Sequence, residues 1–302
     1  MSTSYHVAVI GLGAMGMGAA RSCLRAGLTT YGIDLSEQAR SQLQQAGAAA
    51  VMADARPLAE TLDAVLLLVV NATQVRRILL GEAGLARHLK PGTAIMVSST
   101  IAAEEASALA AELAQMGLPM LDAPVSGGAI KADASEMTVM AAGSDAAFDK
   151  LAPVLDAVAG KVYRVGSEPG QGSTVKIIHQ LLAGVHIAVA AEAMALASRA
   201  GVSLDLMYDV VTHAAGNSWM FENRMPRVLT GDYQARSAVD IFVKDLTLVA
   251  DTAKALRFPL PLASTALNMF LGASNAGHGQ EDDSAVIKIF SGITLPGQEE
   301  QA

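Results

Sequence analysis

The sequence predicts an α/β protein: a doubly wound parallel sheet in the N-terminal part, followed by an all-helical C-terminal domain. Short apolar, strand-like runs alternate with helical patterns up to about Gly166, and glycine-marked turns connect them. This alternation is typical of a parallel sheet covered by helices. From Gln171 onward only helical patterns occur. We therefore expect two domains, residues 1–168 and residues 169–302.

The elements of the first domain follow one another in the order that this fold requires. Strands are expected at residues 7–10, 29–33, 64–70, 93–97, 118–121 and 137–141, and helices at 15–26, 36–46 and 102–116. Ser36 is suited to cap the second helix. The run at 64–70 reads AVLLLVV, which is typical of a central strand buried on both faces.

The second domain is expected to begin with one long helix at residues 173–200, ended by Gly201. Further helices are expected at residues 204–213, 238–256, 261–273 and 284–290, with a polar tail at 296–302. The most apolar stretch, residues 177–197, contains His179, Gln180, His186 and Glu192. Polar groups at this density favour a buried helix over a membrane span.

Composition excludes several functional classes. The 302-residue chain is 52% hydrophobic and carries a net charge of −8 without any run of basic residues. We therefore expect neither nucleic acid nor a membrane surface as a partner. Cys23 is the only cysteine and is expected to be buried, so no internal disulfide can form. A reducing, cytoplasmic location is favoured, because the N-terminus also lacks the pattern of a signal peptide.

A glycine-rich loop joins the first expected strand to the first helix. The glycines of G-L-G-A-M-G occupy the spacing of the Rossmann dinucleotide fingerprint, in the required strand–loop–helix context. The first glycine permits the tight turn, the second lets the backbone approach a pyrophosphate, and the third allows close helix packing. The alternative is a tight turn that binds nothing. The loop residues predicted to bind the cofactor are Gly11, Leu12, Gly13, Ala14, Met15 and Gly16.

The end of the second strand indicates which dinucleotide binds. Asp34 is placed to accept hydrogen bonds from the ribose 2′-hydroxyl, and its charge would repel the 2′-phosphate of NADP. Arg40, the nearest arginine, lies a turn or more into the next helix. The sequence therefore predicts NAD. Residues beside the strand ends are also expected to contact it: Leu35, Val70 and Asn71.

Three later segments carry polar groups in patterns that suggest substrate chemistry. The run D-A-P-V-S-G-G, residues 122–128, places a serine hydroxyl and two open backbone N–H groups in one turn, which suits a carboxylate. Lys176 and His179 lie one turn apart on one helix face. Lys244 and Asp245 interrupt an otherwise apolar helix.

Together these motifs resemble the β-hydroxyacid dehydrogenase family over essentially the whole chain. GLGAMGMG resembles the family's cofactor loop, DAPVSGG its substrate loop, GQGSTVKIIHQ its catalytic helix, and FVKDLTLVADTA its KDL segment. The resemblance implies an NAD-dependent enzyme that oxidises a small hydroxy acid. It implies that Lys176 is the catalytic acid/base, that Ser126, Gly127 and Gly128 hold the substrate carboxylate, and that Thr100 and Lys244 contact the cofactor.

Elementary chemistry agrees with this role for Lys176. The substrate hydroxyl must lose a proton as its carbon loses a hydride, and a lysine of lowered pKa can accept that proton. Burial beside a positively charged nicotinamide is expected to lower the pKa of Lys176. The alternative, a surface lysine, is disfavoured because its neighbours are apolar. No metal is expected, since no cluster of ligand residues stands out.

His179 departs from the family, which mostly carries asparagine at this position. A histidine reaches further and could bind an additional hydroxyl of a polyol acid. Within the family, His179-Gln180 and the run GNSWMFENRMPRVLTGDY resemble the members that oxidise L-threonate. We therefore hypothesise oxidation of L-threonate at C2 to 2-oxo-tetronate. A helix histidine bonded elsewhere is the structural alternative.

Other interpretations remain open. The nearest is an enzyme of the 3-hydroxyisobutyrate dehydrogenase or tartronate semialdehyde reductase type. A 6-phosphogluconate-type decarboxylase would need a cluster of basic residues that the sequence lacks. A non-catalytic NAD-binding module belongs to another class, and Lys176 argues against it. Weaker candidates for the site are Arg224, Trp219 and the acidic segment 281–285, which could equally cap a helix. The long apolar helix suggests a homodimer or homotetramer.

Overall fold

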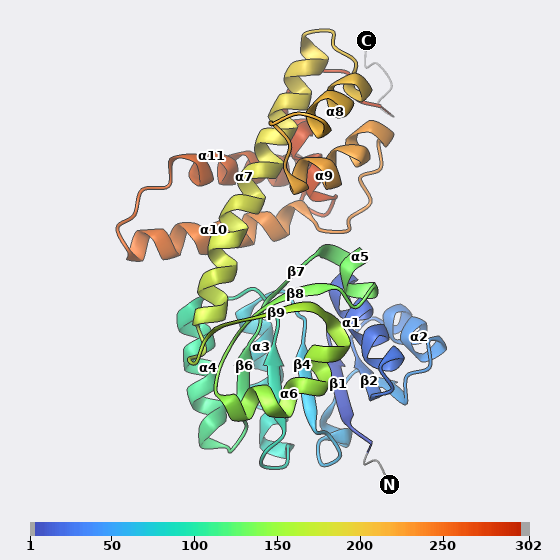
Figure 1. Cartoon of the computed structure of the whole chain (residues 1–302), viewed down its shortest axis with the longest axis vertical. Helices are drawn as coiled ribbons and strands as arrows, with labels where there is room; N and C mark the ends of the chain where they lie inside the picture. The colour runs from blue at the N-terminus through green and yellow to red at the C-terminus, as the bar shows by residue number, and fades with distance from the viewer. Residues whose placement is uncertain (1–3, 297–302) are drawn as a thin grey trace. The chain divides into compact units, whose positions relative to one another are not determined.

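The computed structural model describes residues 4–296, and the chain divides into two compact units, Met1–Lys176 and Ile177–Ala302 (Figure 1). The division lies inside the long helix α7 (Gln171–Arg199), a few residues after the domain boundary expected between residues 168 and 169. The polar tail expected at 296–302 lies, from residue 297 onward, outside the described residues.

The N-terminal unit is built on a mainly parallel sheet, as the alternating pattern predicts. Its parallel strands lie in the order β3-β2-β1-β4-β5-β6. Because the order reverses between β1 and β4, the loops after these strands diverge at a topological switch point. The strands are β1 (His6–Ile10), β2 (Thr29–Ile33), β3 (Ala50–Met52), β4 (Ala64–Leu67), β5 (Ala94–Val97) and β6 (Met120–Asp122).

Beyond β6 the sheet is no longer purely parallel. Strand β8 (Met137–Ala142) pairs antiparallel with β6 and with the two-residue β7 (Val125–Ser126). On its other side β8 pairs in parallel with β9 (Ala159–Gly166). The sheet is therefore dominated by parallel pairing, as predicted, with antiparallel pairs of β8 at this edge. The chain therefore reverses direction between β7 and β8, and the loop that follows Ser126 begins this reversal.

Helices cover both faces of the sheet, so the doubly wound architecture is confirmed (Figure 1). Alternate residues of β1 show this: Val7 and Val9 belong to one buried core, whereas Ala8 and Ile10 belong to the other. The first core is shared with α1 (Ala14–Arg25), α2 (Glu37–Gln45) and α6 (Asp145–Val158), and the second with α3 (Ala72–Leu80) and α4 (Ala103–Gln115).

The helix cap at Ser36 and the burial of Cys23, both predicted from the sequence, are present in this unit. Ser36 caps α2 by accepting a hydrogen bond from the Ala39 N–H. Cys23 is fully buried in α1, and burial raises the pKa of its thiol to about 12. The thiol is therefore a small apolar core group at neutral pH.

The C-terminal unit is helical, as predicted, and within the described residues its β-type pairing is limited to one isolated bridge between Ala238 and Asp282. Its core includes the stacked rings of Phe242 and Phe270, with centroids 5.2 Å apart. The elements after α7 are α8 (Leu204–Thr212), α9 (Trp219–Thr230), α10 (Val239–Ala255), α11 (Pro261–Ala273), a π-helical turn (Ser274–His278) and a 3₁₀ helix (Asp283–Ile289).

Helix α7 has the length and apolar composition of a membrane span, and half of its most apolar window is buried inside the protein. Ile187, Ala191 and Met194 lie in the core of the helical unit. The polar side chain of Gln180 is buried and bonded to Asp245 of α10. These contacts are those of the core helix that the sequence predicts.

Candidate active site

Five predicted site segments follow the carboxyl ends of parallel strands and therefore gather at one edge of the sheet. Gly11 follows β1, Asp34 follows β2, Asn71 comes after β4, Thr100 after β5, and Asp122 ends β6. Parallel strands present all their carboxyl ends at the same edge, where ligands of open α/β sheets bind.

Asp34 is fixed by backbone N–H groups on both carboxylate oxygens. The Leu12 N–H donates to Oδ2 at 2.7 Å, and the Ser36 N–H donates to Oδ1 at 2.7 Å. The loop after β1 and the cap of α2 thus hold one negative charge in place. Arg40 donates to the backbone carbonyl groups of Asp34 and Leu35, at 2.7 and 2.9 Å. Its guanidinium therefore closes this turn.

The three glycines of the fingerprint differ in what the fold itself demands. Gly11 has φ of +91°, and a Cβ added at Gly16 would lie 1.7 Å from the Gly11 carbonyl oxygen. Both positions need glycine for the fold alone. A Cβ at Gly13 would meet no protein atom within 4 Å, so packing does not require glycine there. A bare backbone at Gly13 suits close approach by a pyrophosphate.

The start of α1 completes this cradle. Gly13 is its N-cap and offers no side chain to the first N–H groups of the helix. These groups, together with the helix dipole, suit an anion. At the end of β5, the buried hydroxyls of Ser98 and Ser99 have no hydrogen-bond partner among the described residues. The residues present therefore fit a dinucleotide at this edge.

The substrate loop is shaped by two consecutive glycines with positive φ. Ser126 pairs with Thr138 of β8, and the chain then turns through Gly127 (φ +130°) and Gly128 (φ +70°) into α5 (Gly128–Asp133). A Cβ at Gly127 would lie 2.7 Å from the Cβ of Lys131. Lys131, whose aliphatic stem covers this turn, was not among the predicted site residues.

Gly18 lets α1, which begins at the loop after β1, pack closely against α5, which follows the turn at Gly127 and Gly128. A Cβ at Gly18 would lie 2.6 Å from the Asp133 backbone nitrogen and 2.8 Å from the Ala132 Cβ. Ser22, one turn further along α1, donates to the Ala132 carbonyl at 2.9 Å. The helix that starts at the cofactor loop thus packs directly on the short helix that follows the substrate loop. The sequence signal was the second G-x-G in GLGAMGMG, which the fingerprint alone does not require.

Asp122, the first residue of the substrate-loop motif, holds the first turn of α7. Its Oδ2 accepts from the N–H groups of Gly170 and Ser173, both at 2.8 Å, and its Oδ1 accepts from the Ser173 hydroxyl at 2.6 Å. Gly172 permits the contact, because a Cβ there would lie 2.4 Å from the Asp122 carbonyl oxygen. Burial outweighs these hydrogen bonds and raises the pKa of the Asp122 carboxyl.

Lys176 lies on α7 immediately after this anchored turn and is only 6% exposed. The interpretation as a surface lysine does not agree with that burial. Burial of an amine that must change its protonation state is a feature of general bases. His179, half-buried, follows three residues later on the same helix face.

The helical unit contributes a polar group of four side chains. His179 Nδ1 lies 3.0 Å from Gln180 Oε1, and Gln180 Nε2 donates to Asp245 Oδ2 at 2.6 Å. Lys244 Nζ lies 2.6 Å from Asp245 Oδ1. Lys244 is thus paired with the residue that follows it in the sequence. Gln180 was not among the predicted site residues.

Among the weaker site candidates, Arg224 and the acidic segment 281–285 make contacts that hold the helical unit together. Arg224 makes a buried bidentate ion pair with Asp283, at 2.7 and 3.0 Å. Asp282 caps the 3₁₀ helix through the Ser284 N–H and pairs with Arg227 at 2.5 Å. Burial opposes ionisation of Asp282, but the bonds from Arg227 and Ser284 outweigh it and lower its pKa. The helix-cap interpretation of segment 281–285 accounts for these contacts. Trp219 begins α9 and is half exposed.

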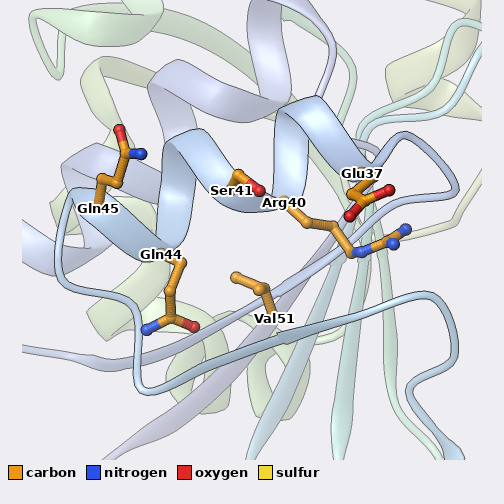
Figure 2. A pocket seen from close by; sticks show the side chains of 6 residues that line it. All are labelled: Glu37, Arg40, Ser41, Gln44, Gln45 and Val51. Atoms are coloured by element: carbon orange, nitrogen blue, oxygen red, sulfur yellow. The ribbon is translucent and has the colours of Figure 1, made fainter.

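A pocket between α2 and β3 is lined by none of the predicted site residues, although its Arg40 donates to the carbonyl groups of Asp34 and Leu35. Its walls come from α2 and from the edge strand β3, where Val51 faces the helix (Figure 2). The lining residues are Glu37, Arg40, Ser41, Gln44, Gln45 and Val51. Among the residues that the structure describes, no group of three or more His, Cys, Asp or Glu side chains is arranged to hold a metal ion.

The fold and the site of the N-terminal unit define a nicotinamide-dependent dehydrogenase, and comparison with known proteins gives the family. Residues 6–166 match the NAD-binding domain of 6-phosphogluconate dehydrogenase. Residues 170–290 match a domain described as NAD-binding of NADP-dependent 3-hydroxyisobutyrate dehydrogenase. The chain belongs to the β-hydroxyacid dehydrogenase family and is an NAD-dependent hydroxyacid dehydrogenase, as the four motifs predicted.

Full-length relatives are similar over nearly the whole chain. The chain is 72% identical to an L-threonate dehydrogenase of Escherichia coli O6:H1 strain CFT073, with 98% of each chain covered. It is 55% identical to an L-threonate dehydrogenase of Cupriavidus necator, covering 98% of this chain and 100% of the relative. A crystal structure from Salmonella typhimurium, described as 3-hydroxyisobutyrate dehydrogenase, is 69% identical, with a TM-score of 0.92 and coverage of 95% and 100%. Proteins of similar sequence identity to this chain thus carry two different substrate names.

Proposed function

We propose that the protein oxidises L-threonate at C2 to 2-oxo-tetronate with NAD, and that Lys176 accepts the hydroxyl proton. The observation that carries this proposal is the placement of Lys176: it is buried, and it follows the helical turn that Asp122 of the substrate-loop motif holds. The substrate name comes from relatives of 55% to 72% identity. The family alternative is a 3-hydroxyisobutyrate dehydrogenase, the name of the 69% identical crystal structure.

Each part of the site has a distinct task in this reaction. The N–H groups at the start of α1 hold the pyrophosphate, and Asp34 accepts from the adenosine ribose. Leu35 and Val70, which are 78% and 47% exposed, offer apolar surface beside the strand ends to the rest of the cofactor. Asn71, Thr100 and Lys244 contribute polar contacts. Bound NAD supplies the carbon that accepts a hydride.

The substrate is held at its carboxylate and its hydroxyls. The Ser126 hydroxyl and the N–H groups of Gly127 and Gly128 bind the carboxylate, because charge-assisted hydrogen bonds of this kind are strong. Lys176, as the neutral amine, takes the proton of the C2 hydroxyl. His179 binds a hydroxyl further along the acid. This division explains why a polyol acid suits a chain that has histidine in place of the family asparagine.

A substrate panel tests the proposal. Purified protein is mixed with NAD and L-threonate, 3-hydroxyisobutyrate or glycerate, and absorbance is followed at 340 nm. L-Threonate is expected to be turned over with the highest kcat/KM. Turnover of 3-hydroxyisobutyrate or glycerate without turnover of L-threonate would reject the substrate and leave the reaction class standing.

We also propose a cytoplasmic homodimer or homotetramer. Apolar side chains that are 38% to 69% exposed recur along one line of α7 at intervals of three, four and seven residues: Val175, Ile178, Leu182, Val189 and Leu196. A row with this spacing suits helix packing against a second copy. Sedimentation velocity is expected to show a dimer or larger species, and Leu182→Glu with Val189→Glu should shift it to the monomer. A monomeric wild type would contradict this proposal.

A further inference from the structure

A buried chain of polar contacts joins α7 to α10 and ends on His179. Gln180 and Asp245 are 7% and 2% exposed, and each bonds to the next group in the chain. Asp245 Oδ1 lies 2.6 Å from Lys244 Nζ, Asp245 Oδ2 accepts from Gln180 Nε2 at 2.6 Å, and Gln180 Oε1 lies 3.0 Å from His179 Nδ1.

The direction of these hydrogen bonds follows from which groups can donate. The Asp245 carboxylate, which is paired with Lys244, only accepts hydrogen bonds. The Gln180 amide must therefore turn its NH₂ toward Asp245, since the flipped amide would set two oxygen atoms against each other. Its Oε1 then faces His179 and can only accept, so His179 Nδ1 must carry a hydrogen.

The contact is not needed to pack the two helices. One turn further along α7, a Cβ added at Gly184 would lie 2.8 Å from Leu246 Cδ2, so the helices already approach closely through apolar atoms. A buried pair of polar side chains adds little net stability compared with apolar residues of the same size. The chain of contacts is better explained by what it does to the histidine.

We propose that Gln180 and Asp245 are positioning residues that hold His179 in the Nδ1-protonated tautomer, so that Nε2 accepts a hydrogen bond from a substrate hydroxyl. This rests on the proposed function, in which the substrate is a polyhydroxy acid. In the opposite tautomer Nε2 would be a donor. An asparagine at this position could rotate its amide to donate or accept. With histidine, the contact of Nδ1 with Gln180 fixes Nε2 as an acceptor.

The tautomer itself is the first test. The chain has 6 histidines, so the ring nitrogens give a small ¹⁵N spectrum in which His179→Asn identifies the His179 signals. In the wild type at neutral pH, Nδ1 is expected to show the protonated shift and Nε2 the unprotonated shift. A predominant Nε2-protonated ring in the wild type would overturn the proposal. This arm needs no knowledge of the substrate.

The second test is the variant Gln180→Met, which keeps the length of the side chain and removes both hydrogen bonds. The His179 signals are expected to move toward the Nε2-protonated form. The kcat/KM for L-threonate should fall about 10-fold or more, the loss of roughly one good hydrogen bond. The value for 3-hydroxyisobutyrate, which lacks a further hydroxyl, should change less than about threefold. Gln44→Met, the same change at a glutamine of α2 that donates to Ala48, is the matched control.

A double-mutant cycle separates positioning from structure. In a His179→Asn background, Gln180→Met is expected to have almost no further effect on kcat/KM, because no tautomer remains to be set. An equal loss in both backgrounds would assign Gln180 a purely structural role and overturn the proposal. A wild type that turns over another hydroxy acid but not L-threonate would reject the proposed substrate, while the spectrum still decides the tautomer.

Discussion

The loop after β1 and the polar face of α7, the two proposed binding regions, are built in different ways. In the loop the backbone dominates: close backbone contacts require glycine at Gly11 and Gly16, and Asp34 is fixed by two backbone N–H groups. The face of α7 carries side chains instead, namely Lys176, His179 and Gln180, which are buried or half-buried. Gln180 bonds to Asp245, which is distant in sequence. Backbone sites tolerate almost no change of residue type, whereas side-chain sites can be retuned one residue at a time.

The largest expected effect comes from the side-chain site. Lys176→Met keeps the bulk of the side chain and removes the amine, so kcat should fall about 100- to 10,000-fold, the usual contribution of a general base. Affinity for NAD, measured by calorimetry, should stay within about threefold of the wild-type value if the lysine acts only on the substrate. Turnover that survives the substitution would mean that another group takes the proton.

The backbone site is tested by two substitutions of the same kind at neighbouring glycines. Gly16→Ala should destabilise the fold by about 2 to 3 kcal/mol, because the new methyl group overlaps the Gly11 carbonyl oxygen. Gly13→Ala should lower stability by less than about 1 kcal/mol and still weaken NAD binding at least tenfold. Thermal unfolding and calorimetry measure the two quantities. Similar unfolding temperatures for both variants would show that the loop relaxes more than its geometry suggests.

Asp122 holds the start of α7, and its removal is expected to lower the stability of the fold by about as much as Gly16→Ala. Asp122→Ala leaves the Gly170 and Ser173 donors unpaired and should lower the free energy of unfolding by about 3 kcal/mol. Asp122→Asn should cost much less, because its oxygen can accept from both N–H groups while its NH₂ donates to the Ser173 hydroxyl.

The same pair of variants predicts a dependence on pH with a definite sign. Burial raises the pKa of Asp122 in the folded state above its unfolded value. The stability from this difference is fully present below the unfolded pKa and is lost as pH rises through the folded pKa. Asp122→Asn cannot ionise, so its stability relative to the wild type should increase from acid toward neutral pH. Chemical denaturation at several pH values measures this, and a relative stability that falls with pH would contradict it.

The smallest effect is expected at the cofactor-selecting carboxylate. Asp34→Asn keeps the acceptor for the Leu12 N–H and removes the charge that repels a 2′-phosphate. The ratio of kcat/KM for NAD over NADP should fall about tenfold, since Arg40 is already engaged by two carbonyl groups and offers little to the phosphate. Initial rates with both cofactors give the ratio. A complete switch to NADP would mean that Arg40 leaves its carbonyl partners.

How far the sequence predicts this molecule depends on how local each signal is. The strands of the switch point, the α2 cap at Ser36 and the glycine loop are encoded within a few residues, and the structure has them there. The sequence pattern did not predict β9, because this edge strand has no buried residue and no apolar alternation. Nor did it predict α6, whose interior contains Pro153.

Whether a residue of the candidate site could be predicted also depends on how local its sequence signal is. Lys176, Asp34 and the glycines were found from motifs, because each motif spans a single turn or loop. The contact of Asp122 with Ser173 spans 51 residues, and that of Gln180 with Asp245 spans 65. Hydrogen bonds between such distant residues leave no periodic pattern. They become visible only once the helices and strands are placed.

The packing of α1 on α5 through Gly18 has a consequence for the range of acids that can react. In the proposed function the loop after β1 holds the dinucleotide and the turn at Gly127 and Gly128 holds the carboxylate, so this packing sets the acid group of every substrate at one place relative to the nicotinamide. Longer or shorter acids can then differ only at their other end. Selection between substrates of different length then depends on the side chains that contact the end of the substrate opposite its carboxylate.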